Sequence, residues 1–451
     1  MTGRACPWYS QRMKLKTTFI FNYHTLMTRR AVFLAASLVA ASAYAQPKIT
    51  LSPDEPQPGI PRPPILQLPR ESQIEVPLDQ TATSGSTAIG GYGELTLNAP
   101  SNGPNVVDVR RIVLYFGHNF TQRLRFYGEL ELEHAVTSAA DKGEFEVEQA
   151  FLDYLAWKPL NFRAGLIIMP VGIINIYHEP PTFNGVDRPE TDTRIIPSTW
   201  REPGAGAFGE ARGLRYQAFV VNGFNANGFT AAHGLFDGHQ EGQLALGHDW
   251  GLVARVDYGL PFLYRHRISA DAGASFYYAH ADQGQAQFRG SDGDSVPVTV
   301  AEGDLRVRSR GLELRAEIAS VWIGGTHRLN RALAAAAAAA TPMQSFDGPV
   351  AHQLLGGYVE LGYNVLTALR LRSGMSLVPF LRYEHTDTQY ALPDDLARAP
   401  GNRHDTITAG LTVRPIAEVA VKLDYQHVWT DATESRDAEV DRYNLGLAFM
   451  F

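Results

Sequence analysis

The last nine residues of the chain, 443–451, read YNLGLAFMF. Large hydrophobic side chains stand at every second position of this stretch, and the chain ends on an aromatic residue. These alternate residues are Tyr443, Leu445, Leu447, Phe449 and Phe451. Because successive side chains of a β-strand point to opposite faces, the spacing predicts a final strand with one wholly apolar face.

Such an ending resembles the terminal recognition signal of bacterial outer-membrane proteins, which the barrel assembly machinery reads as an added strand edge. The resemblance implies the partners that the chain meets in the outer membrane. We expect the assembly machinery as a partner during insertion, and outer-membrane lipid and lipopolysaccharide around the finished barrel.

The same alternation extends upstream. One face of the segment near residue 130 carries Leu124, Phe126, Leu130 and Leu132, and the other carries Arg123, Arg125, Glu129, Glu131 and Glu133. Similar patterns cover residues 407–414, and residues 421–426, where Lys422 lies on the polar face. One face of each segment suits lipid and the other suits water.

Tight connections at 158–161, 259–262 and 415–418 contrast with long polar loops such as 223–249 and 387–403. Short turns on one side and long loops on the other are typical of outer-membrane barrels. About fifteen strand candidates lie between residues 88 and 451, and bacterial barrels have even numbers. We therefore predict an all-β fold, a transmembrane antiparallel β-barrel of about 16 strands, with 14 as the fallback.

A soluble β-sandwich or propeller also has alternating strands and is the alternative fold. The length of the segments and the ladders of charges on their polar faces favour the barrel.

The N-terminal region predicts export. From Met27, the basic pair Arg29 and Arg30 precedes an apolar stretch and then the small-residue site Ala43-Tyr44-Ala45. This pattern indicates a secretory signal peptide cleaved before Gln46, with Met27 as a candidate for the true start, because the apolar run is too short for a membrane span. We expect a pre-sequence and signal at 1–45, a proline-rich periplasmic arm at 46–87 and the barrel at 88–451.

Charge and cysteine content exclude several classes of protein. Six of the 40 basic residues and none of the 47 acidic ones lie in residues 1–45, which leaves a net charge of −13 for residues 46–451. This balance argues against nucleic acid as a partner. The single cysteine, Cys6, lies in the segment expected to be removed, which excludes thiol catalysis and cysteine metal sites.

A constriction is predicted in residues 173–203, a long stretch without alternation between a strand at 162–169 and one that begins near Gly204. It carries charges of both signs: Asp187, Arg188, Glu190, Asp192, Arg194 and Arg201. Charges of both signs across a narrowed lumen would create a transverse field and bind solute. The alternative is an ordinary solvated external loop.

Two rows of arginine are candidates for lining the pore. Arg306, Arg308 and Arg310 form one row, and Arg123 and Arg125 form the other. Such rows could guide an anion, since the arginine charge persists and its fork binds carboxylate or phosphate in two places. The alternative is that nearby acids such as Glu129 and Glu313 pair with them.

Two other sequence patterns give weaker indications of structure or function. His233, His239 and His248 share a long loop with Asp237 and Glu241, but their irregular spacing favours a solvated loop over a metal site. We expect no metal, no cofactor and no catalytic residues. The alanine run in Arg331 to Thr341 predicts a short helix or low-complexity insert in an external loop.

Several short segments, in order, resemble the phosphate-selective porin O and P family of Gram-negative outer-membrane porins. They are the Arg110-Arg111 pair, Glu148 to Tyr154 (EQAFLDY), Phe162 to Gly172 (FRAGLIIMPVG), Val378 to Glu384 (VPFLRYE), Val421 to Tyr425 (VKLDY) and Gly446 to Phe451. The resemblance implies a sixteen-stranded barrel, a homotrimer, an inward-folded loop and an anion-binding zone.

The expected function is passive diffusion of small solutes through a water-filled outer-membrane channel, with small inorganic or organic anions such as phosphate as the solutes. Two alternatives remain. One is an outer-membrane barrel enzyme, for which Ser and His positions show no recognisable motif. The other is a closed structural or adhesive barrel in which the inward charges pair completely.

Cleavage of the signal can be checked directly. We expect intact-mass and N-terminal analysis of the protein purified from outer membranes to find a chain that begins at Gln46. Recovery of a chain that still carries Met1 would contradict the export prediction.

Overall fold

The strands of the chain close into a barrel in a computed structural model, which describes residues 84–138, 142–260, 263, 266–290, 295–340, 346–369 and 374–451. The predicted signal peptide (1–45) and nearly all of the predicted arm (46–87) lie outside these residues. The first strand begins at Thr87, at the end of the predicted arm.

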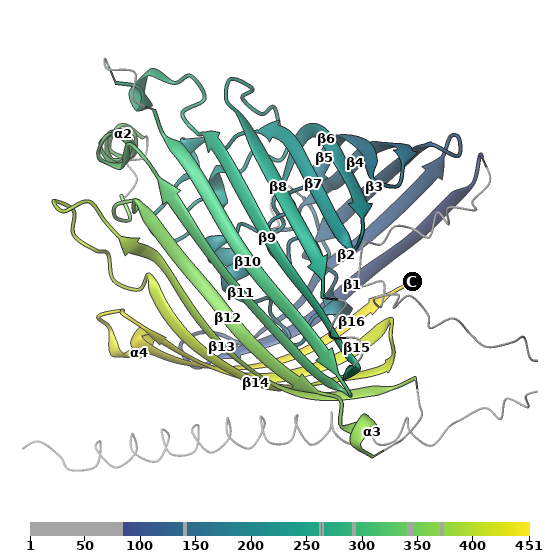
Figure 1. Cartoon of the computed structure of the whole chain (residues 1–451). Helices are drawn as coiled ribbons and strands as arrows, with labels where there is room; N and C mark the ends of the chain where they lie inside the picture. The colour runs from purple at the N-terminus through teal and green to yellow at the C-terminus, as the bar shows by residue number, and fades with distance from the viewer. Residues whose placement is uncertain are drawn as a thin grey trace, which may run out of the picture. The chain divides into compact units, whose positions relative to one another are not determined.

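Sixteen strands form the wall (Figure 1). In chain order they are β1 Thr87–Pro100, β2 Val106–Asn119, β3 Leu124–Glu133, β4 Phe145–Trp157, β5 Leu160–Ile168, β6 Arg201–Ala211, β7 Leu214–Asn222, β8 Trp250–Gly259, β9 Ile268–His280, β10 Pro297–Ser309, β11 Leu312–Ile323, β12 Gln353–Tyr363, β13 Ser376–Ala391, β14 Arg403–Ile416, β15 Val419–Thr430 and β16 Glu439–Met450.

Short helical segments lie in the connections between strands. They are η1 Pro180–Thr182, η2 Thr191–Ile195, η3 Ala226–Gly228, η4 Phe236–Gly238, η6 Ala286–Phe288, α2 Thr326–Ala339, α3 Val365–Ala368 and α4 Ser435–Ala438.

Each strand pairs antiparallel with the next along the chain, and β1 pairs with β16 to close the barrel. Closure leaves no sheet edge, so the backbone of every strand finds hydrogen-bond partners on both sides. The prediction of a sixteen-stranded antiparallel barrel is confirmed.

The closing contact involves the last residue of the chain. The Phe451 N–H donates to the Gly91 carbonyl at 2.9 Å, and the Gly91 N–H donates to the Phe451 carbonyl at 3.0 Å. The Tyr115 hydroxyl also donates to the Phe451 carbonyl, at 3.1 Å. The aromatic rings of the last strand lie against glycines of β1: a Cβ added at Gly93 would stand 2.8 Å from the ring of Phe449. The C-terminal pattern therefore completes the barrel.

The connections differ at the two ends of the barrel. The tight turns at 158–159, 212–213, 310–311 and 417–418 lie at the end where β1 begins and β16 finishes. The long segments 169–200, 223–249 and 324–352 lie at the opposite end. In outer-membrane barrels the short turns are periplasmic and the long loops external. The connection expected to be tight at 259–262 is longer, because β9 begins only at Ile268.

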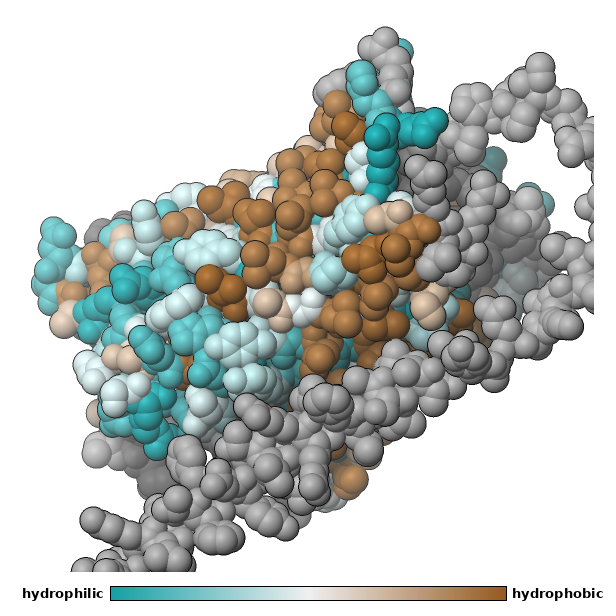
Figure 2. Space-filling view, turned by 90° about the horizontal axis from the view of Figure 1, so that it is seen from below, coloured by the Kyte–Doolittle hydropathy of each residue, from teal (hydrophilic) through white to brown (hydrophobic). Residues whose placement is uncertain are grey.

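The outward-facing side chains of the strands are largely apolar and exposed. Examples from eight strands are Leu114, Leu252, Phe276, Ile318, Val359, Leu381, Leu423 and Leu447. Figure 2 shows hydrophobic residues gathered over the middle of the visible face and hydrophilic ones toward one end. An apolar exterior on a closed barrel is what contact with lipid requires. The chain is therefore an outer-membrane β-barrel, as predicted.

The alanine-rich stretch belongs to α2, which lies between β11 and β12 at the long-loop end (Figure 1). The helix begins at Thr326, before the alanine run, because Leu329 and Asn330 are buried and anchor its first turn. Among the described residues, no helix is both long enough and apolar enough to cross a membrane.

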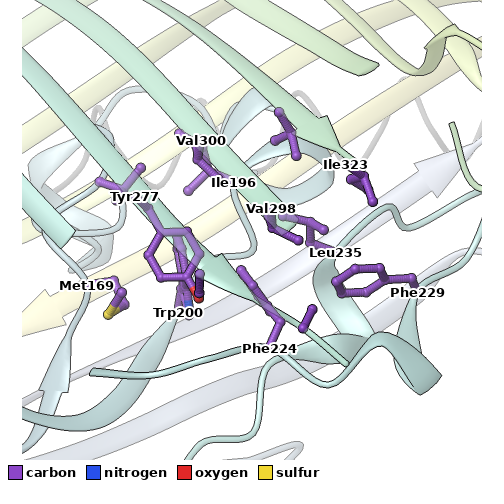
Figure 3. Packing of buried hydrophobic residues seen from close by; sticks show 14 of the residues in the cluster. Met169, Ile196, Trp200, Phe224, Phe229, Leu235, Tyr277, Val298, Val300 and Ile323 are labelled. Atoms are coloured by element: carbon purple, nitrogen blue, oxygen red, sulfur yellow. The ribbon is translucent and has the colours of Figure 1, made fainter. Parts of the chain in front are cut away.

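An apolar cluster fills part of the external half of the barrel interior (Figure 3). Trp200 stacks on Phe224 with ring centroids 4.8 Å apart, and Tyr277 meets Trp200 edge-on at the same distance. Phe229 and Leu235, from the loop expected to be a polar external one, are buried in this cluster. Burial of each such side chain stabilises the fold by about 1.5–3 kcal/mol. The part of the 223–249 loop up to Leu235 thus packs inward, whereas Leu244 is exposed.

Asn175 ties together the two ends of the long segment between β5 and β6. Its amide nitrogen donates to the carbonyl oxygens of Met169 (2.7 Å) and Trp200 (3.1 Å). Its amide oxygen accepts from the Trp200 N–H at 2.7 Å. These contacts turn the segment, called the inner loop (residues 169–200) below, into the barrel at a fixed point.

Deletion of Phe451 should impair assembly, because it removes the paired hydrogen bonds to Gly91 and the aromatic end of the signal. The measurement is the fraction of protein that runs as a heat-modifiable, folded barrel on gels of outer membranes. The matched control is Phe145→Ala, which removes an exposed aromatic side chain from the external end of β4. An undiminished folded fraction after deletion of Phe451 would count against the closing role.

Replacement of Asn175 by alanine should loosen the inner loop and destabilise the barrel by about 2 kcal/mol or more, because hydrogen bonds are lost and buried backbone groups stay unpaired. Denaturant unfolding in detergent and tryptic cleavage within 169–200 would measure this effect. Asn227→Ala, at an exposed asparagine of another loop, is the control. Equal stability and equal protease resistance in both variants would refute the prediction.

Candidate functional site: a loop held inside the barrel

The inner loop occupies the barrel interior, as expected for the predicted constriction. The neighbouring strands differ slightly from the prediction: β5 spans Leu160–Ile168 and β6 already begins at Arg201. Its η1 segment contacts β1, β15 and β16, and its η2 segment contacts β11, β12 and β13. The loop therefore lies against the wall on the β11–β16 side.

Carboxylates of the wall accept hydrogen bonds from the backbone of the inner loop. Glu317 accepts from the Ile173 N–H at 3.1 Å. Asp424 accepts from the Val186 N–H at 2.6 Å, and Glu384 does the same for a third loop N–H, also at 2.6 Å. Buried N–H groups outside regular structure need such acceptors. These inward acids therefore hold the loop.

Arginines of the wall satisfy carbonyl groups of the same loop. Arg315 donates to the Thr182 carbonyl at 2.8 Å, and Arg414 donates to the Pro181 carbonyl at 2.9 Å. Guanidinium groups suit this task because each offers several donors from one charged fork.

Three predicted constriction residues lie at the part of the loop nearest β1, β2 and β13–β16. Asp187 pairs with Arg110 at 2.7 Å, and both side chains remain partly exposed. Arg188 donates to the hydroxyl of Thr199 at 3.2 Å. Glu190 pairs with Arg194 at 3.7 Å.

Glu190 is the best-compensated acid of the loop. Burial by itself would raise the pKa of its carboxyl, but the hydrogen bond with His404 at 2.8 Å and the charges of Arg194 and Arg442 lower the pKa to about 2. Since this lies below the usual value of 4.5, the carboxylate stabilises the folded state above pH 4.5. That contribution is lost as the pH falls toward 2.

The other predicted constriction residues are buried. Asp192 is fully buried, and burial together with the nearby carboxylates of Glu302 and Glu384 raises the pKa of its carboxyl well above the usual value. Arg201 lies in β6 rather than in the loop, and it pairs with Glu146 at 2.5 Å and Glu241 at 3.1 Å.

The predicted arginine rows are shorter in the structure. Arg306 and Arg308 face inward on β10, but Arg310 lies in the turn beyond β10 with a positive φ of 49°. Arg125 faces inward on β3, whereas Arg123 lies exposed in the preceding turn. The prediction that Arg310 and Arg123 line the pore beside their neighbours is wrong. β10 ends at Ser309 and β3 begins at Leu124, so each of these two arginines lies one residue outside its strand.

Lys422 points inward from β15 as predicted, but its side chain is buried beneath the inner loop. Its ammonium group lies 3.8 Å from the centroid of the Phe183 ring. The prediction that Lys422 lines an open pore is therefore not met in this structure, because Phe183 covers it.

The inward side chains of the wall form what we call the interior charge network, in which every member is 8% exposed or less. Its members are Glu94, Arg111, Glu129, Glu131, Glu148, Arg255, Glu302, Asp304, Arg315, Glu317, Glu360, Arg382, Glu384, Lys422 and Asp424. Ion pairs run through it, such as Arg255 with Asp304 at 2.6 Å and Arg111 with Glu94 at 3.0 Å. These inward charges are therefore covered by the inner loop or by one another.

Toward the periplasmic end, five inward arginines remain partly exposed, and we call them the lower arginine group. They are Arg125, Arg163, Arg215, Arg306 and Arg308. Most have acidic or aromatic neighbours. Arg163 pairs with Asp153 at 2.8 Å, Arg308 pairs with Glu313 at 3.3 Å, and Arg306 lies 4.7 Å from the ring of Tyr177.

Arg125 differs from the rest of the lower arginine group. Its Nε is buried without a hydrogen-bond partner, and it forms no ion pair with any described residue. Arg308 pairs with Glu313, as the alternative interpretation of the arginine rows predicts. Arg125 pairs with neither Glu129 nor Glu131, because Glu129 accepts from Gln149 and faces His178, and Glu131 pairs with Arg111.

Sequence reasoning missed most of the arginines that hold the interior together. Arg255, Arg315 and Arg382 stand singly between apolar residues rather than in rows. Their positions at alternate places of long strands were the available signal, but only the closed barrel brings them against acids of strands distant along the chain.

The histidines of the 223–249 loop do not meet. His233 pairs with Asp237 at 3.0 Å, His239 with Glu241 at 3.0 Å and His248 with Asp249 at 2.7 Å. The three histidines thus lie in separate pairs, with His233 and His248 exposed and His239 largely buried.

Comparison with solved structures finds outer-membrane proteins at low similarity. The outer membrane channel DcaP of Acinetobacter baumannii is 13% identical, with a TM-score of 0.49, over 82% of this chain and 98% of that one. OmpF of Salmonella typhi is 12% identical, with a TM-score of 0.49 and the same coverage. OmpT of Vibrio cholerae, an outer membrane protein, is 10% identical over 82% of this chain and 98% of that one, with a TM-score of 0.46.

No protein-family model matches the chain. A protein of Aquifex aeolicus (strain VF5), described as "Uncharacterized protein", is 31% identical over 369 residues, which cover 81% of this chain and 80% of that protein. Identity at this level over four fifths of both chains shows common descent, and the chain belongs to the same family as this Aquifex aeolicus protein.

Proposed function

We propose that the chain is an outer-membrane porin that passes small solutes by passive diffusion, with small anions such as phosphate preferred. The observation that carries the proposal is the lower arginine group, which offers partly exposed cationic side chains on the inward face of a closed barrel. Selectivity in channels follows the charges at accessible narrow sections rather than the net charge of the chain.

The acidic net charge of residues 46–451 does not oppose this proposal. Many of the inward acids accept hydrogen bonds from the inner loop or pair with buried arginines, as Glu384, Asp424 and Asp304 do. Their charges are compensated by fixed partners, whereas Arg125 lacks such a partner among the described residues. A mobile anion entering from the periplasmic end would therefore meet an uncompensated positive charge.

The resemblance to the phosphate-selective porin O and P family supports the same proposal. It implies an inward-folded loop and an anion-binding zone, and the lower arginine group supplies the residues for such a zone. We extend the proposal to a homotrimer surrounded by lipid and lipopolysaccharide and inserted by the barrel assembly machinery. Transport of this kind involves no chemical step.

Burial of the interior charge network favours a second candidate, a closed structural or adhesive barrel. Its members are 8% exposed or less, and the inner loop and parts of the external loops pack inside the barrel. Single-channel recording in planar bilayers distinguishes the two. Discrete conductance steps from folded protein support the porin, and their absence over a wide voltage range favours the closed barrel.

The anion preference predicts the effect of Arg125→Ala combined with Arg215→Ala. Removing these inward charges should shift the reversal potential in a salt gradient toward cation selectivity, because fewer positive charges face the permeating ion. The matched control is Arg123→Ala combined with Arg310→Ala, which removes two positive charges from turns at the same end. A cation-selective parent protein, or equal shifts in the two double variants, would overturn the anion assignment.

A further inference from the structure

Three buried side chains meet where the inner loop approaches the β3–β4 wall: Glu129 from β3, Glu148 from β4 and His178 from the loop. The His178 Nε2 lies 3.4 Å from an oxygen of Glu148 and 3.8 Å from an oxygen of Glu129. One ligand atom from each residue falls within 4.8 Å of the others. Ligands of a tetrahedral zinc ion with bonds of about 2.0–2.2 Å lie about 3.3–3.6 Å apart. The His178–Glu148 distance lies within this range, and the His178–Glu129 distance exceeds it by a few tenths of an ångström, so a small closing movement of Glu129 would complete the spacing for a first-row metal ion.

The orientation of each side chain is fixed by a second contact. The His178 Nδ1 lies 3.2 Å from the Asn175 carbonyl oxygen, so Nδ1 donates to it, and this contact leaves Nε2 facing the two carboxylates, where a bound cation would take the place of a proton. Tyr92 donates to the other oxygen of Glu148 at 3.2 Å, and Gln149 donates to the other oxygen of Glu129 at 2.5 Å. Metal ligands are characteristically held by outer contacts of this kind.

The atoms that face one another lack hydrogen bonds. Glu148 is 0% exposed, Glu129 2% and His178 3%. Neither the His178 Nε2 nor the facing Glu148 oxygen has a hydrogen-bond partner among the described residues. Buried polar atoms without partners are destabilising, and two that are aimed at one point call for an explanation.

The local charge favours a cation. Five buried carboxylates lie in this region, and the guanidinium groups near them include Arg111, Arg188 and Arg201, of which Arg201 pairs with Glu146 and Glu241. The carboxylates are Glu94, Glu129, Glu131, Glu148 and Glu179. Arg111 pairs with Glu94 and Glu131, and Arg188 donates to backbone and hydroxyl oxygens of the loop. Glu129 and Glu148 therefore have no guanidinium ion pair, and a divalent ion would neutralise them.

We propose that Glu129, Glu148 and His178 bind one divalent transition-metal cation, with Zn²⁺ as the probe, and that the ion fastens the inner loop to the β3–β4 wall. Imidazole and carboxylate oxygens suit zinc, and burial of the ligands indicates a structural site. The loop is then held on both sides, because its backbone is already bound to the wall at Glu317, Glu384 and Asp424.

The test is zinc binding by the full mature protein, folded in detergent, stripped with a chelator and loaded with Zn²⁺. Metal analysis after gel filtration should find one zinc per chain, and calorimetric titration should give saturable binding at that stoichiometry. Zinc should also raise the thermal unfolding temperature of the barrel. These readouts require no conductance, so failure of the metal site and failure of the porin proposal are distinguishable.

Variants locate the site. Glu148→Gln and His178→Gln should abolish stoichiometric binding, and Tyr92→Phe, which removes only a hydroxyl that orients Glu148, should weaken it by about tenfold or more. The control is His233→Gln with Asp237→Asn, which removes an exposed histidine–carboxylate pair from the 223–249 loop and should leave binding unchanged. Heat-modifiable mobility confirms that each variant is folded.

Two outcomes would overturn the proposal. One is the absence of stoichiometric zinc in the folded parent protein, which leaves an ion pair between a protonated His178 and Glu148. The other is binding that survives both ligand substitutions, or that is lost in the control, which would place the ion elsewhere. If a ligand variant fails to fold, the comparison of Tyr92→Phe with the parent protein decides.

Discussion

One constraint governs the interior of this barrel. The backbone of the inner loop needs hydrogen-bond partners, and the strand backbones cannot provide them because they are paired with one another. The strand backbones pair with their neighbours all around the closed sheet. The loop therefore depends on inward side chains, and the acids Glu317, Glu384 and Asp424 accept its N–H groups while Arg315 and Arg414 donate to its carbonyls. A buried loop without such partners would be strongly destabilised.

This constraint explains why charges are so dense inside the barrel and so little exposed. A charge that binds a loop group or an opposite charge is compensated in place, and the ion pairs of Arg255 and Arg382 serve this purpose. Inward arginines that remain partly exposed lie toward the periplasmic end. The lower arginine group occupies that region, and the apolar cluster around Trp200 packs the external loops over part of the opposite end.

Asn175 links the entry point of the inner loop to the orientation of His178. Asn175 connects both ends of the loop, through Met169 and Trp200, and its own carbonyl orients His178 toward Glu129 and Glu148. The same residue therefore fixes where the loop enters the barrel and how the histidine faces the wall. A shift of the loop would break both sets of contacts together, which makes its movement a cooperative event rather than a gradual one.

The sequence by itself determined the architecture. Alternation with period two, short turns against long loops and the aromatic ending at Phe451 predicted a barrel of sixteen strands and the place of the inner loop, because strand geometry and the lipid environment impose those patterns directly on the chain. It did not determine which charges pair. Arg123 and Arg310 were predicted to belong to rows that line the pore, but both lie in turns. Lys422 was predicted to line the pore, but Phe183 covers it. The proximity of His178 to two strand carboxylates corresponds to no local pattern in the sequence. Only the tertiary structure decided these points, because closure of the barrel and inward folding of the loop join residues far apart in the chain, and no short-range periodicity records such contacts.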